Sequence, residues 1–148
     1  MKREIKFRGL PTCKEKDELD YINFDRDGNF AVGFYEDGYI IGKVADANDE
    51  YIYPEFWVAV DRNTVGQYTG LKDKNGREIY EGDIIVTHPK SKYEAPKSGV
   101  VQYGGSRPMF GYKTEDGEEY DIWSSNAYRT YEVIGNIFEN PELLEGKQ

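Results

Sequence analysis

Side chains able to carry out nucleophilic or acid–base chemistry are few in this chain. His88 is the only histidine and Cys13 the only cysteine among 148 residues. Ser91 and Ser98 are close to His88 in sequence, but a catalytic histidine must be held beside a nucleophile by a second group. Neither serine is framed by a nucleophile elbow. The pattern predicts a protein that is not an enzyme, and a hydrolase that uses His88 or carboxylates is the less favoured alternative.

The acidic clusters have the spacing of turns rather than of metal sites. Asp46, Asn48 and Glu50 match the first ligands of a calcium loop, but Tyr51 and Trp57 stand where that loop needs glycine and glutamate. One cysteine and one histidine are too few for a structural zinc site. The carboxylates at residues 115–121 flank a turn and are expected to form a solvated edge. We therefore expect no metal and no cofactor.

One segment is basic although the chain has a net charge of −9, which disfavours general binding to phosphate backbones. Residues 87–98 hold three lysines and one glutamate, a net charge of +2. In small barrels such a loop often lines a groove for a peptide or a nucleic acid. A solvated loop is the simpler interpretation. The candidate partner-binding residues are His88, Lys90, Lys92, Tyr93, Lys97 and Arg107.

The second half of the chain has the pattern of a small β-barrel. Asn75-Gly76 predicts a hairpin with a type I′ turn, and Asp116-Gly117 predicts another tight turn. Five strands are expected at residues 79–87, 99–103, 109–114, 118–123 and 131–138. Their number and spacing favour an SH3-like barrel, with an OB-like barrel as the alternative. Asn140 and Pro141 predict a short C-terminal helical turn.

The first half predicts a β-meander. Turns at Asp27-Gly28 and Asp37-Gly38 separate short apolar runs, residues 46–50 are expected to form an acidic loop, and an aromatic segment surrounds Trp57. The expected division is a β extension over residues 1–64 and a barrel with its helical turn over residues 65–148. The two halves could also form one continuous domain.

The composition indicates a cytoplasmic protein. A single cysteine allows no intramolecular disulfide, which suits a reducing compartment. No apolar run approaches the roughly 20 residues of a membrane span. The 13 tyrosines and 2 tryptophans suit an interface, because these rings pack against apolar atoms and still reach water.

Three blocks of the sequence resemble the YopX family of phage and prophage proteins from Gram-positive bacteria. They read IKFRG at residues 5–9, VGQYTGLKDKNGREIYEGD at residues 65–83 and YEVIGNIFENPELL at residues 131–144. The resemblance implies a phage or prophage origin, and therefore the cytoplasm of a bacterial host cell, and a β-rich fold. It carries over no catalytic residue, because no biochemical activity is assigned to the family.

These observations lead to a hypothesis of a non-enzymatic accessory protein that binds a protein partner or associates with itself as an oligomer. The alternative is a nucleic-acid-binding regulator that uses the basic loop at residues 87–98. The alternative predicts an affinity that falls steeply with salt.

Overall fold

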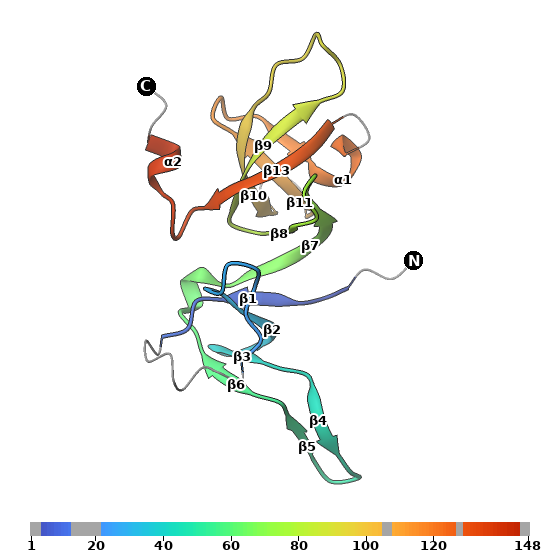
Figure 1. Cartoon of the computed structure of the whole chain (residues 1–148), viewed down its shortest axis with the longest axis vertical. Helices are drawn as coiled ribbons and strands as arrows, with labels where there is room; N and C mark the ends of the chain where they lie inside the picture. Colours follow the sequence, from blue (N-terminus) through green and yellow to red (C-terminus); the bar gives the residue numbers. More distant parts are fainter. Residues whose placement is uncertain (1–3, 13–21, 105–107, 127–128, 146–148) are drawn as a thin grey trace. The chain divides into compact units, whose positions relative to one another are not determined.

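A computed structural model of the chain describes residues 4–12, 22–104, 108–126 and 129–145. The chain divides into two compact units, Met1–Tyr68 and Thr69–Gln148. Strand β7 (Gly66–Lys72) begins in the first unit and ends in the second. The secondary structure is mainly β, as predicted (Figure 1). In the part of the chain that the structure describes, no helix has the length and apolar character needed to cross a membrane.

The first unit is an antiparallel sheet in the order β6-β3-β2-β1-β7. Its other strands are β1 (Phe7–Gly9), β2 (Ala31–Glu36), β3 (Tyr39–Ile41) and β6 (Trp57–Ala59), and a 3₁₀ turn follows at Arg62–Thr64. Asp37 and Gly38 join β2 to β3 with φ angles of 41° and 91°. Positive φ at both positions is what a type I′ turn requires. The predicted β-meander is therefore present.

A second pair of strands, β4 (Val44–Ala47) and β5 (Ile52–Pro54), extends the ribbon that β3 and β6 begin. The N–H of Gly42 donates to the carbonyl of Phe56 over 2.9 Å, and that of Glu55 donates to the carbonyl of Lys43 over 2.7 Å. We call residues 44–54 the arm; Figure 1 shows it projecting beyond the ends of β3 and β6. The expected acidic loop is thus shorter than predicted, because Asp46 already belongs to β4.

The core of the first unit lies on one face of this sheet. Ala31 and Ile40 are completely buried there, with Phe56 and Val58 against them. Gly33 is needed between these strands, because a Cβ atom at this position would lie 2.3 Å from the carbonyl oxygen of Ile41. Close packing of β2 on β3 therefore depends on a residue without a side chain.

The second unit contains a five-stranded antiparallel sheet in the order β12-β11-β10-β9-β13. Its elements, with the short strand that precedes them, are β8 (Glu78–Tyr80), β9 (Asp83–Pro89), β10 (Ser98–Tyr103), β11 (Phe110–Thr114), β12 (Glu119–Asp121), α1 (Ile122–Ser125), β13 (Arg129–Asn136) and α2 (Glu142–Glu145). Helix α2 is the predicted C-terminal helical turn. Ile85, Val101, Tyr112 and Tyr131 form the centre of the core.

Asp73 joins the hairpin between β7 and β8 to β13. Its Oδ1 accepts hydrogen bonds from the backbone N–H groups of Asn75 and Arg77, both 2.9 Å long, and its Oδ2 accepts one from Val133 at 2.9 Å. Only 7% of Asp73 is exposed. A buried carboxylate held by three N–H donors fixes the hairpin on the edge of β13.

The predicted barrel is not closed. Strands β12 and β13 are the two edges of an open sheet, and neither the SH3-like nor the OB-like arrangement is specifically supported. Strand β12 has three residues before the chain turns into α1. The outer edge of β13 is already bonded: besides the bond to Asp73, the carbonyl of Tyr131 accepts from the N–H of Lys74 over 2.8 Å. The hairpin therefore occupies the edge that barrel closure would need.

Two local predictions also need correction. The strand expected at residues 79–87 is divided into β8 and β9 by a turn in which Gly82 has a φ of 89°. The hairpin at Asn75-Gly76 exists, but Gly76 has a positive φ of 83° and Asn75 does not. A type I′ turn is therefore wrong, because it needs positive φ at both central residues; the N–H of Gly76 instead closes a turn on the carbonyl of Asp73.

Candidate functional site

The predicted partner-binding residues surround the loop that joins β9 to β10. His88 lies on β9, while Lys90, Lys92, Tyr93 and Lys97 follow it. Arg107 lies outside the described residues, and so does Cys13. The structure therefore places five of the six predicted residues in one hairpin, and their contacts decide what that hairpin can bind.

His88 contacts a carboxylate on the neighbouring strand. Its Nε2 is 2.9 Å from Oε1 of Glu132, and the Nζ of Lys74 is 3.5 Å from the same oxygen. The hydrogen bond from His88 and the positive charge of Lys74 lower the pKa of Glu132. This arrangement holds β13 against β9 and the β7–β8 turn.

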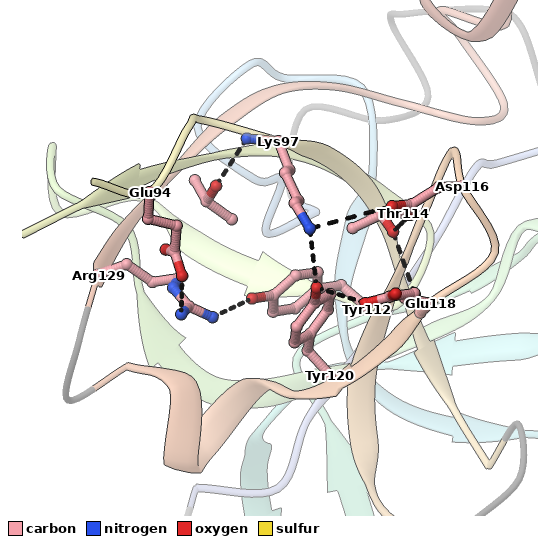
Figure 2. A network of polar contacts seen from close by, with 9 residues as sticks. Glu94, Lys97, Tyr112, Thr114, Asp116, Glu118, Tyr120 and Arg129 are labelled. Carbon is pink, nitrogen blue, oxygen red and sulfur yellow. Dashed lines mark hydrogen bonds and ion pairs between the residues drawn. The ribbon is translucent and has the colours of Figure 1, made fainter. Parts of the chain in front are cut away.

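Lys97 belongs to a network on the same unit that Figure 2 shows. Its Nζ donates to the hydroxyl of Tyr120 over 2.9 Å and lies 4.0 Å from Oδ2 of Asp116. The Tyr120 hydroxyl in turn donates to Oε2 of Glu118 over 2.8 Å. The hydrogen bond with Tyr120 raises the pKa of Lys97, and a hydrogen bond from Thr114 lowers the pKa of Asp116. The ammonium group of Lys97 is thus held by groups of its own chain.

Arg129 closes the other side of this network. Its Nη2 lies 2.8 Å from Oε1 of Glu94, and its Nη1 donates to the hydroxyl of Tyr112 over 3.1 Å. Burial opposes a positive charge, but the contacts with Tyr112 and Glu94 outweigh it and raise the pKa of Arg129. The rings of Tyr112 and Tyr120 are stacked with centroids 5.2 Å apart. The network joins β11, β12 and β13 to the loop.

Two charged side chains of the loop are engaged by the strands of the second unit. Glu94 pairs with Arg129, and the ammonium group of Lys97 donates to the hydroxyl of Tyr120. Tyr93 is 88% exposed, with the Nζ of Lys92 5.4 Å from its ring centroid. Lys90, Lys92 and Tyr93 are the exposed residues of the candidate site. Their use in binding stays a prediction.

Metal binding has no visible basis in residues 4–12, 22–104, 108–126 and 129–145, where no three histidine, cysteine, aspartate or glutamate side chains come together. The calcium-like spacing at residues 46–50 has another explanation. Asn48 turns its Oδ1 toward the backbone N–H groups of Glu50 and Tyr51, at 2.8 and 3.1 Å. Asn48 therefore stabilises the turn at the tip of the arm.

A second candidate surface lies in the first unit and was not predicted. Phe34, Ile41 and Trp57 are directly opposite one another on β2, β3 and β6, on the face away from the core. Phe34 is 57% exposed and Trp57 is 61% exposed. Directly opposed side chains on neighbouring strands touch. They therefore form a continuous apolar row across the sheet.

A shallow groove of about 400 Å³ adjoins this row; its walls are Glu36, Asp37, Tyr39, Ile41 and Trp57. Glu36 pairs directly with Tyr39 on the exposed face. Tyr39 is two residues from Ile41 on β3, and Ile41 pairs with Trp57. The groove thus combines two aromatic rings with carboxylates.

The arm continues the exposed apolar surface. Val44, Tyr51, Ile52 and Tyr53 are all exposed, and the rings of the two tyrosines meet edge to face with centroids 4.9 Å apart. Two isolated strands are at best marginally stable in water. A hairpin that exposes four large apolar side chains is therefore suited to contact with another molecule.

The sequence contained one usable signal for this surface. The run Tyr51-Ile52-Tyr53 follows an acidic turn and precedes Pro54 and Glu55. An edge or protruding strand is where proline and charge are expected. Because alternating aromatic and aliphatic residues are also typical of a half-buried strand, the pattern does not by itself reveal which face is exposed.

The chain is similar in sequence to one protein family and in structure to two solved proteins. A family model described as YopX protein matches residues 16–145. The crystal structure of protein EF1440 from Enterococcus faecalis is similar, with 30% sequence identity, a TM-score of 0.54, and coverage of 97% of this chain and 99% of that one. YopX from Bacillus subtilis shares the fold, with 18% identity, a TM-score of 0.50, and coverage of 99% and 100%.

Protein Abitram from Xenopus tropicalis is 33% identical over 79 residues, which are 50% of this chain and 43% of that protein. This chain thus matches less than half of the length of Abitram. The family model, by contrast, extends over most of the chain and across both compact units. The chain belongs to the YopX family.

Proposed function

We propose that this chain is a non-enzymatic accessory protein of a phage or prophage that binds a protein partner through the first unit. The binding surface consists of the arm, residues 44–54, and the adjoining apolar row of Phe34, Ile41 and Trp57. The resemblance to the YopX family supports the phage or prophage origin. The observation that carries the binding function is the exposure of the arm.

The composition of this surface supports protein binding. Tyrosine and tryptophan are enriched in protein interfaces and supply much of their binding energy. Trp57 is 61% exposed and Ile52 is 62% exposed, within a single ribbon. Contact with a partner would remove the apolar surface of both side chains from water. Each methylene group buried in this way contributes about 0.8 kcal/mol to the binding free energy.

The contacts of the reactive side chains support a non-enzymatic role. His88 is bonded to Glu132, and Lys97 is bonded to Tyr120. Tyr131 donates its hydroxyl to the carbonyl of Ile122 over 2.8 Å, and burial raises its pKa. These groups serve the packing of the second unit.

A different protein is a better partner than a second copy. Residues 42–56 contain four carboxylates and one lysine, a net charge of −3, within a chain of net charge −9. Pairing two such ribbons would place like charges together, which costs binding energy. The partner is therefore expected to carry positive charge.

Differential capture tests this function. The wild-type protein is immobilised beside an arm variant, Val44→Thr, Ile52→Thr and Tyr53→Thr, and a control variant with exposed substitutions in the second unit, Tyr103→Thr, Ile134→Thr and Leu144→Thr. Proteins retained from host lysate are identified by mass spectrometry. We expect one or more proteins on the wild type and the control variant that are absent from the arm variant. Identical sets on all three would contradict the proposal.

A further inference from the structure

The groove beside the arm has a chemical composition that selects a particular side chain. It presents Tyr39 and Trp57 as exposed rings, Glu36 as an exposed carboxylate, and Ile41 as an apolar floor. A guanidinium group is planar, stacks on aromatic faces, and forms two parallel hydrogen bonds with a carboxylate. An arginine side chain can therefore stack on the aromatic rings of this groove and form hydrogen bonds with its carboxylate at the same time.

A contact within the protein illustrates this chemistry at one end of the groove. Arg62 donates from Nη1 to Oδ1 of Asp37 over 2.7 Å and from Nη2 to the carbonyl of Asp37 over 3.1 Å. Asp37 belongs to the same groove wall as Glu36. The turn between β2 and β3 thus already binds one guanidinium, and Glu36 faces the sheet surface where Tyr39 and Trp57 lie.

We propose that this groove binds an arginine side chain from a basic, extended segment of the partner. The inference rests on the proposed function and adds the chemistry of the partner. The apolar residues of that segment lie along Phe34 and the arm, while the net charge of −3 over residues 42–56 attracts its other basic side chains. Charge complementarity favours this occupant over a second copy of a chain with net charge −9.

The two tryptophans make a direct experiment possible. Trp57 lies in the groove and Trp123 lies on α1 in the second unit, so the Trp123→Phe variant reports on the groove alone. The difference between the signals of the wild type and of Trp123→Phe, both with an intact groove, reports on Trp123. The probe is a capped peptide of three Gly-Arg-Val repeats. Matched peptides carry lysine or uncharged citrulline in place of arginine.

We expect the arginine peptide to change the fluorescence of Trp57 in a saturable manner and to leave that of Trp123 unchanged. The citrulline peptide should bind at least about tenfold more weakly, since it cannot form a charge-assisted hydrogen bond. The lysine peptide should fall between them, because an ammonium group lacks the planar fork of arginine.

Carboxylate variants separate specific binding from general attraction to an acidic protein. Glu36→Gln should weaken binding of the arginine peptide by about fivefold or more. Glu142→Gln, an exposed substitution in the second unit with the same change in charge, should alter it by less than about twofold. Equal effects of the two variants, or equal binding of the citrulline peptide, would overturn the proposal.

The outcomes also separate this inference from the proposed function. If differential capture succeeds but the arginine peptide fails to bind, the arm binds a partner of other chemistry and only this inference is wrong. Sedimentation velocity over a range of concentrations adds a third result. A dimer that Trp57→Ala abolishes would replace the basic partner with a second copy of the chain.

Discussion

At the scale of single residues, Asp73 illustrates how one buried carboxylate connects segments far apart in the sequence. It accepts N–H groups from its own turn and from Val133, 60 residues further along the chain. Removing such an acceptor leaves buried N–H donors without a partner. The resulting loss of folding free energy exceeds the net stabilisation that a hydrogen bond between protein groups ordinarily provides.

We predict that Asp73→Ala lowers the free energy of unfolding by about 2–4 kcal/mol, because up to three backbone donors lose their acceptor. Asp73→Asn keeps one acceptor oxygen and should cost less. The measurement is urea unfolding followed by circular dichroism. Asp49→Ala, at the exposed tip of the arm, is the control and should change stability by less than about 0.5 kcal/mol. Similar effects for Asp73→Ala and Asp49→Ala would refute the anchoring role.

The ion pair of Glu132 predicts a dependence on pH. The pKa of Glu132 is lowered in the folded protein by His88 and Lys74, so its contribution to stability is present above the ordinary value of 4.5 and is lost as pH falls below it. Wild type should exceed Glu132→Gln in stability at neutral pH, and the difference should shrink on acidification. Unfolding curves between pH 3 and pH 7 check this. A difference that grows toward low pH would contradict it.

At the scale of elements, the arm is expected to contribute little to the stability of the first unit. Ile40 and Ile52 lie in the same ribbon, but Ile40 is fully buried and Ile52 is 62% exposed. We predict that Ile40→Ala costs about 2–5 kcal/mol and Ile52→Ala less than about 0.5 kcal/mol. Thermal unfolding monitored through Trp57 compares them. A large loss for Ile52→Ala would mean that the arm serves folding rather than binding.

Most elements could be predicted from the sequence because their signals are local. Glycine-containing turns at Asp37-Gly38 and Asp116-Gly117 and the apolar runs between turns set strand positions within a few residues. The open sheet could not be predicted, since it depends on the bond between Asp73 and Val133 across 60 residues. The pairing of the loop's one acidic residue was also hidden, because Glu94 meets its partner Arg129 only in the folded chain.

The exposed surface of the first unit was missed for a related reason. Alternation assigns each of Phe34, Ile41 and Trp57 to one face of its own strand. It does not say which face of each strand meets the core. Ala31 and Ile40, on the opposite face, pack with Val58 and leave the larger side chains outside. Burial therefore follows from the register of three strands together.

At the scale of the whole molecule, the charge of the chain predicts its response to nucleic acids. Lys97 is bonded to Tyr120, and the net charge is −9. We predict no binding of labelled single- or double-stranded DNA at low salt. The few exposed lysines of the loop would not offset the repulsion between the negatively charged protein and the phosphates. Fluorescence anisotropy checks this. Saturable binding that Lys92→Ala weakens would favour the nucleic-acid-binding alternative.

Site-specific photo-cross-linking tests most directly whether the arm contacts a partner. A photoreactive phenylalanine analogue replaces Tyr53 of the arm, which is 54% exposed, or Tyr103 of the second unit, which is 52% exposed, in bacterial cells that contain the protein. We predict a discrete cross-linked product of higher mass at position 53 and none at position 103. Equal labelling at the two positions, or a product from position 103 alone, would contradict the account.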